Sequence, residues 1–156
     1  MTPTQQLNGF IAKYSPEVAA IGRAVLKKMR TRIPGAIEMV YDNYNGLVVG
    51  FSPTERPSDA IFSIILFPRW VTLCFLFGAF LDDPHHLLKG SGVRVRTLRL
   101  ASAADLDRPA VRALVDRAVA EAEGPMRRTS QHQLVIRAVQ KKQRPRRPRQ
   151  DSPTSC

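Results

Sequence analysis

The spacing of hydrophobic residues changes along the chain, and each change marks a different kind of secondary structure. Residues 5–14 and 15–33 place apolar side chains three or four positions apart, which is typical of amphipathic helices. After Ala36 the apolar residues alternate with polar ones or form short runs, which predicts β-strands. A third helical segment spans residues 107–124, and a short β-branched run follows at residues 133–139. That run predicts a last strand.

Several boundaries carry residues that commonly begin or end a helix. Ser15 can accept the first free backbone N–H groups, and Pro16 suits the first helical position. Pro34 should stop this helix. Asp107 is expected to cap the later helix, and Gly124 is expected to end it.

Four strands are predicted between residues 36 and 77, joined as two hairpins. The first hairpin turns at Asn45-Gly46, a dipeptide that readily takes positive φ angles, and the second turns at Pro68-Arg69. A fifth strand is expected over residues 94–100. This order of elements predicts an α+β fold, in which two main helices pack on one face of an antiparallel sheet of five to six strands. Without βαβ alternation no Rossmann-type site can form, and we predict no cofactor.

Length and charge divide the chain into a domain and a tail. A chain of 156 residues can bury a sizeable core as one domain. Its net charge of +11 is uneven, because residues 125–156 hold nine of the 24 Lys and Arg residues and only one acid. We therefore predict a single domain over residues 1–139 and a disordered basic tail over residues 140–156.

Other features bear on where the protein works. Residues 63–81 are mostly apolar, but Pro68-Arg69 interrupts them, so two strands are favoured over a membrane span. The N-terminus lacks the pattern of a secretion signal. Cys74 lies in an apolar run and Cys156 is the last residue, so both are expected to be free thiols in a reducing compartment. The expected location is the cytoplasm.

The stretch FLDDPHHLLKGSG concentrates chemically active side chains. Asp82, His85 and His86 offer oxygen and imidazole ligands for a metal ion, although closed sites usually recruit ligands from separated segments. Glu38, Asp42 and His132 are distant candidates for further ligands. The favoured interpretation is simpler: Asp83 caps a short turn, and the histidines lie at the surface.

The end of the same stretch predicts an anion site. Glycines allow backbone N–H groups to turn toward an anion, and Ser, Lys and Arg side chains add donors and charge. The phosphate-loop pattern G-x-x-x-x-G-K-[ST] is absent, so no nucleotide motif supports this site, and a flexible turn remains the alternative. The candidate anion ligands are Lys89, Ser91, Arg94 and Arg96.

A second candidate site surrounds the motif YDNYN. If Val40 faces the core, strand alternation carries Asp42 inward, where its carboxylate needs a partner or a raised pKa. The carboxylate would then be either a structural acid bonded to turn amides or a functional group in a cleft. Tyr41, Tyr44 and Trp70 are the aromatic residues that such a cleft would use.

Catalysis is poorly supported by the sequence. Cys74 has no identifiable electropositive neighbour, no G-x-S-x-G motif exists, and no catalytic residue is assigned. The sequence therefore favours a protein that is not an enzyme.

Two long motifs together resemble a known family. The segments VYDNYNGLVVGFSPTERPSDAIFSI and PRWVTLCFLFGAFLDDPHHLLKGSGVRVRTLRL, and the ending VIRAVQKKQRPRRP, are similar to the YdhG-like bacterial domain family of unknown function. The resemblance implies a compact α+β fold similar to frataxin, and one family member is assigned an iron-chaperone role. Frataxin-type iron binding is attributed to an acidic ridge on the first helix, whereas residues 17–32 here contain one acidic and five basic residues.

Three functional hypotheses follow. The first is a non-enzymatic binding protein for a small anionic ligand or partner, held by the YDNYN and KGSG residues together. The second is a frataxin-like metal-handling protein that uses Asp82, His85 and His86. The third is nucleic-acid association through the basic tail, where clustered Lys and Arg release counterions on binding. No membrane partner is expected.

Overall fold

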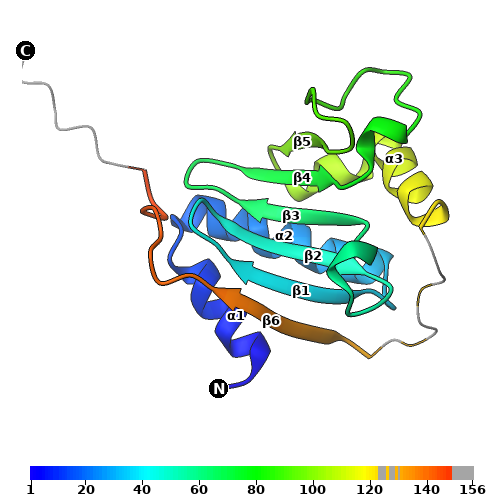
Figure 1. The fold of residues 1–156 in the computed structure, drawn as a ribbon. Coiled ribbons are helices and arrows are strands. Elements are labelled where there is room, and N and C mark those ends of the chain that lie inside the picture. Colours follow the sequence, from blue (N-terminus) through cyan, green and yellow to red (C-terminus); the bar gives the residue numbers. More distant parts are fainter. Residues whose placement is uncertain (123–125, 127–128, 130, 149–156) are drawn as a thin grey trace, which may run out of the picture.

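The computed structural model describes residues 1–122, 126, 129 and 131–148, which form a six-stranded sheet with three α-helices on one of its faces (Figure 1). The helices are α1 (Pro3–Ala12), α2 (Pro16–Arg32) and α3 (Pro109–Ala120). The strands are β1 (Ile37–Asp42), β2 (Leu47–Ser52), β3 (Phe62–Leu66), β4 (Val71–Phe75), β5 (Arg96–Leu100) and β6 (Gln133–Val139). Short 3-10 helices lie at Pro57–Asp59, Gly78–Phe80 and Ala103–Asp107.

The strands are ordered β5-β4-β3-β2-β1-β6, so the first five form the predicted antiparallel meander. β6 pairs with β1 in parallel, because the chain returns after α3 to the end of the sheet at which β1 begins. The predicted α+β class is confirmed, and the sheet is mixed rather than wholly antiparallel.

One hydrophobic core lies between the sheet and the helices. β1 contributes Val40, β2 contributes Val49, and β3 contributes Ile64, all fully buried. Strand alternation sends every second side chain to this helix-covered face and its neighbours to the opposite face. The buried residues that the helices add are Leu7, Ile11, Val18, Val25, Leu26, Met29, Val111, Leu114 and Val115.

The two long helices begin differently. The Ser15 hydroxyl accepts a hydrogen bond from the Val18 N–H, as predicted for a cap. The predicted cap Asp107 is wrong, because the residue before α3 is Arg108 and its side chain makes no capping bond. Asp107 ends a 3-10 helix and pairs with Lys28 and Arg32 of α2 instead. The hydrogen bond from Lys28 lowers the pKa of Asp107. α3 ends at Ala120, and Gly124 lies outside the described residues.

The Asn45-Gly46 turn joins β1 to β2 as predicted, but neither residue has a positive φ. The glycine is needed for close approach, since a Cβ on Gly46 would lie 2.6 Å from the backbone oxygen of Leu66 at the end of β3.

Elsewhere in the fold, none of the described helices has the length and apolar character that crossing a bilayer requires.

We expect Gly46→Ala to destabilise the protein by roughly 1–3 kcal/mol, because the added methyl group must displace backbone rather than a flexible side chain. Gly9→Ala is the matched control, since a Cβ there meets nothing within 4 Å and alanine favours the helix. Urea unfolding of both variants measures the difference. Equal stability of the two variants would show that the turn can relax.

Candidate functional site

Asp42 is the one charged residue of the motif YDNYN, and it is fully buried. Asp42 follows Val40 on the helix-covered face of β1 and has no exposed surface. Its Oδ2 accepts a hydrogen bond of 2.9 Å from Lys13 Nζ, and its Oδ1 accepts one of 2.9 Å from Arg146 Nη2. The predicted inward position is confirmed. The partners are two cations distant in sequence rather than the turn amides, so Asp42 belongs to a structural ion-pair cluster.

Tyr14 completes this cluster at the junction of α1 and α2. Its hydroxyl donates to the Leu66 carbonyl and accepts from the Leu47 N–H, each at 2.9 Å. The guanidinium of Arg146 lies 5.7 Å from the centre of the Tyr14 ring. Burial raises the pKa of Tyr14 to about 12, so the phenol keeps its proton even in mild alkali. Its two hydrogen bonds join the ends of β2 and β3.

Residues 140–148 fold back over the β1–β2 turn, so the prediction of disorder from residue 140 does not hold for this segment. The backbone N–H of Gln140 donates to the Asp42 carbonyl, and that of Arg144 donates to the Tyr44 carbonyl, both at 2.9 Å. Arg146 is 5% exposed and also donates to the carbonyls of Asn43 and Tyr44. The C-terminal segment therefore supplies donors to the carbonyls of Asp42, Asn43 and Tyr44. Residues 149–156 lie outside the described residues.

Strand register separates the two predicted halves of the anion site. We define the hairpin end of the sheet as the end where β1 stops at Asp42, β3 stops at Leu66 and β5 stops at Leu100. The loop end is the opposite end, where β5 starts at Arg96 beside Phe75. YDNYN and Trp70 occupy the hairpin end, whereas the KGSG loop joins the loop end (Figure 1). The structure does not bring them around one cavity.

The KGSG loop is a connector in its own right. Lys89 and Thr97 exchange two backbone hydrogen bonds of 2.8 Å, so the loop closes as a local antiparallel turn. Gly90 has φ of 132°, which favours glycine. Arg96 turns its guanidinium back to the carbonyls of Gly92 and Val95. The other predicted anion ligands, Lys89, Ser91 and Arg94, are exposed.

The predicted metal ligands do not converge. Asp83 accepts hydrogen bonds from the N–H groups of Leu87 and Leu88, which confirms the capped turn. Asp82 pairs with Arg117 of α3, at 3.7 Å. The histidines of this turn, His85 and His86, are exposed. Across the described part of the chain, no three His, Cys, Asp or Glu side chains gather as a metal site would require.

Glu38 and His132, two of the distant candidates for metal ligands, do meet, but the cation that binds the Glu38 carboxylate is the guanidinium of Arg30. Glu38 is 1% exposed, and Arg30 of α2 donates two hydrogen bonds to its carboxylate, at 2.7 and 2.8 Å. His132, just before β6, contacts the same carboxylate through Nε2. This cluster connects α2, β1 and the start of β6. The alternation of β1 was the signal that could have identified Glu38, since it shares a face with Val40 and Asp42.

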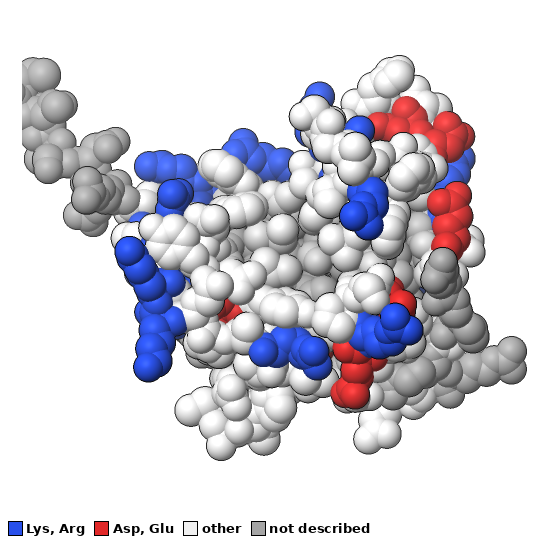
Figure 2. Space-filling model, viewed as in Figure 1, with Lys and Arg blue, Asp and Glu red and all other residues white. Residues whose placement is uncertain are grey.

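On the face of the sheet opposite the helices, Ile37 and Met39 of β1 pack with Ala60 in a small second buried cluster, and the middle of β2, β3 and β4 carries small side chains. Register places Met39, Gly50, Ser63, Cys74 and Thr97 side by side in one row across five strands. Small residues between larger ones produce a trough that crosses the strands. Figure 2 shows this face as a hollowed surface with little charge in its middle, bordered on several sides by Lys and Arg and at the right by acidic residues.

The neighbouring row toward the hairpin end carries a tyrosine at one side and an arginine at the other. It contains Tyr41, Val48, Ile65, Thr72 and Arg99. The trough itself contains Cys74, and burial raises the pKa of this residue, so its thiol is a weak nucleophile. The two rows together therefore offer contacts for a ligand rather than a catalytic group.

Aromatic rings and arginines pair at the hairpin end. The guanidinium of Arg99 lies 4.0 Å from the centre of the Trp70 ring, and that of Arg144 lies 5.4 Å from the Tyr44 ring. Both Trp70 and Tyr44 are 37% exposed. The sequence indicated Tyr41, Tyr44 and Trp70, but Arg99 and Arg144 were missed, because the pairings depend on tertiary contacts.

Comparison with protein-family models, with curated proteins and with solved structures finds no match.

We expect Asp42→Asn to destabilise the fold by about 3–5 kcal/mol, because it leaves the buried guanidinium of Arg146 without its anion. Asp116→Asn removes an exposed carboxylate of α3 and serves as the control, with an expected change within about 0.5 kcal/mol. Urea unfolding measures both. A loss below about 1 kcal/mol for Asp42→Asn would show that the ion pair is dispensable.

The raised pKa of Tyr14 predicts a loss of stability in alkali. The folded state holds the phenol proton more tightly than the unfolded chain, so this stabilisation is complete below pH 10 and disappears as pH rises toward 12. The loss should amount to roughly 2–3 kcal/mol. Urea unfolding of wild type and Tyr14→Phe across this range isolates the effect, because the variant should show a shallower decline. Parallel curves would contradict the assignment.

Proposed function

We propose that this protein is a non-enzymatic binding domain for an anionic partner, and that the partner is single-stranded nucleic acid held on the face of the sheet opposite the helices. One observation carries the proposal: an uncharged trough crosses the sheet, and exposed basic residues border it beside aromatic rings (Figure 2). The sequence predicted a small anionic ligand held by YDNYN and KGSG together. Because those motifs lie at opposite ends of the sheet, we propose a longer ligand instead.

Charge complementarity favours an anion at this surface. Residues 40–50, 66–72 and 133–148 contain one acid, Asp42, which is buried and paired. The exposed cations of the same segments and of β5 are Arg69, Arg99, Arg137, Lys141, Lys142, Arg144 and Arg147. Phosphate groups placed among such cations release counterions, which supplies salt-dependent affinity.

Geometry and aromatic content favour a single strand over other polyanions. Neighbouring strands are spaced about 4.8 Å apart, so the trough extends roughly 20–25 Å from the β6 edge to the β5 edge. Arg99 lies on the β5 edge strand, and Arg137 is the residue added by a bulge in β6 at the other edge. Bases can stack on Tyr41, Tyr44 and Trp70, an interaction that an acidic peptide lacks.

The iron-handling alternative has no comparable support. Its candidate ligands are an exposed pair of histidines and an aspartate paired with Arg117, and the buried acids of the sheet are neutralised by arginines. The tail hypothesis is included in the present proposal, since Lys141, Lys142 and Arg144 are placed at the hairpin end.

The test is fluorescence anisotropy with a labelled mixed-sequence single strand of about 12 nucleotides, titrated at about 50 and 200 mM salt. We expect binding that weakens steeply with salt and quenches Trp70, the one tryptophan of the chain. Arg99→Ala with Arg137→Ala should weaken binding about tenfold or more and reduce the salt slope. The matched control removes two exposed cations of α2 on the other face, by Arg23→Ala with Lys27→Ala.

Three results would contradict the proposal. These are no binding at the lower salt concentration, equal losses in the two double variants, and equal affinity for an oligoglutamate of the same charge. The last would assign the surface to acidic proteins. Deletion of residues 140–156 is unsuitable as a test, because it also removes Arg146 from the buried carboxylate of Asp42.

A further inference from the structure

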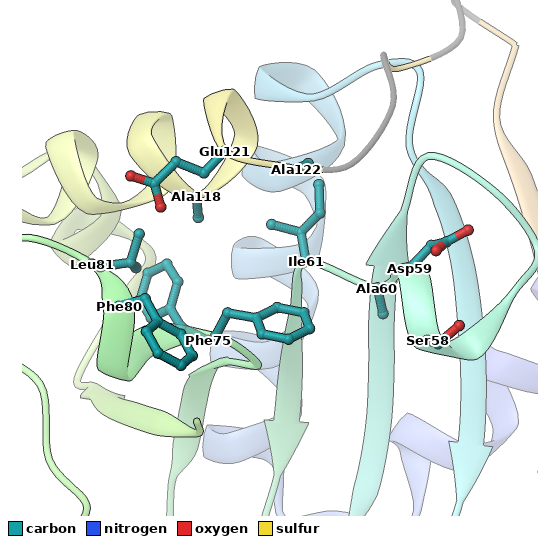
Figure 3. Close-up of a pocket in the computed structure, with 11 residues that line it drawn as sticks. Ser58, Asp59, Ala60, Ile61, Phe75, Phe80, Leu81, Ala118, Glu121 and Ala122 are labelled. Atoms are coloured by element: carbon teal, nitrogen blue, oxygen red, sulfur yellow. The ribbon is translucent and has the colours of Figure 1, made fainter. Parts of the chain in front are cut away.

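A separate cavity of about 300 Å³ lies at the loop end of the sheet (Figure 3). It is enclosed by the segment before β3, the loop after β4 and the last turn of α3. Ile61 and Phe75 line it from the ends of the sheet, Phe80 and Leu81 from the loop after β4, and Ala118 from α3. This volume is at the lower end of the range for small-molecule sites. The register places the cavity away from the aromatic and arginine pairs of the hairpin end.

The walls of the cavity are apolar and partly aromatic. Figure 3 shows the rings of Phe75 and Phe80 and the side chains of Ile61 and Leu81 around the space. Phe80 is 66% exposed, and Phe77, which also lines the cavity, is 46% exposed. Exposed phenyl rings beside a cavity leave apolar area that a bound ring can cover, which favours binding of a compact aromatic or apolar group.

The charge at the cavity is negative, although the chain as a whole carries +11. Glu121 lines the cavity as the C-cap residue directly after α3, where the free helix carbonyls already concentrate partial negative charge. Asp59 lines the opposite side, but its carboxylate accepts a hydrogen bond of 2.7 Å from the Thr54 hydroxyl and pairs with Arg56 at 4.0 Å. Glu121 is therefore the acid that the proposed site uses. The nearby cation Arg117 donates to the Asp82 carbonyl at 2.8 Å and pairs with its carboxylate.

A carboxylate at a helix C-terminus is locally unfavourable, because like charges meet there. A bound cation would relieve that repulsion, and the apolar walls would hold the remainder of the same molecule. We propose that this cavity binds a small aromatic or apolar molecule bearing a protonated amine, with the ring between Phe75 and Phe80 and the ammonium group at Glu121. This site is independent of the nucleic-acid surface.

The experiment uses three probes with the same phenyl body and different charge: 2-phenylethylamine, 2-phenylethanol and 3-phenylpropionate. Binding to the full chain is followed by backbone amide NMR shifts at Ile61 and Ala118. We expect the amine to bind best, the alcohol several-fold more weakly and the carboxylate least. Tryptophan fluorescence should stay unchanged, since Trp70 lies at the other end of the sheet.

Four variants isolate the contributions. Glu121→Gln should reduce the affinity for the amine to that for the alcohol, whereas Asp116→Asn, an exposed acid on the same helix, should leave it unchanged. Ala118→Leu fills the cavity and should abolish binding of both probes. Phe80→Ser gives a second test of the wall should Ala118→Leu fail to fold, because this exposed ring is not needed for the core.

Three results would overturn the proposal. The first is that none of the probes shifts the Ile61 and Ala118 amides. The second is that the amine and the alcohol bind wild type equally. The third is that Glu121→Gln leaves the preference for the amine intact.

Discussion

The carboxylate of Asp42 is fully buried at the end of β1, and Lys13 and Arg146 neutralise it from opposite ends of the chain. A buried carboxylate without a partner would cost several kcal/mol, so the position of both cations is strongly constrained. Lys13 lies at the end of α1, and Arg146 brings the C-terminal segment over the β1–β2 turn. Tyr14 then bonds the neighbouring ends of β2 and β3. The N-terminal helix, the sheet and the C-terminal segment thereby share one cluster.

That cluster also gives the two ends of the sheet different characters. Asp42 is the one acid of residues 40–50, 66–72 and 133–148 and is buried, so the exposed surface of these segments keeps its Arg and Lys charge next to Tyr44 and Trp70. At the loop end Glu121 and Asp59 border an apolar cavity. The middle of the face between them carries little charge because its central row consists mainly of small residues. One domain thus offers an anion-binding surface and an acid-bordered cavity at separate places.

Local patterns predicted the elements well and their long-range contacts poorly. The β-branched run at residues 133–139 corresponds to β6, and the Ser15 cap formed as expected, since both depend on near neighbours. Asp107 fulfilled the pattern of a cap but pairs with α2, because Lys28 and Arg32 come close only in the fold. Lys89, Ser91 and the YDNYN residues were expected to form one site, whereas the antiparallel register sends them to opposite ends.

The sequence by itself determined the α+β class, the strand meander and the inward direction of Asp42, because hydrophobic periodicity and capping act within a few residues. Only the tertiary structure decided which partners the buried charges have, since Lys13, Asp42 and Arg146 are far apart along the chain. It also decided that residues 140–148 are ordered: their composition is typical of disorder, and a single buried ion pair with a few backbone hydrogen bonds opposes that tendency. The stretch FLDDPHHLLKGSG became a connector for the same reason, because its neighbours in space are the edge of β5 and α3 rather than YDNYN.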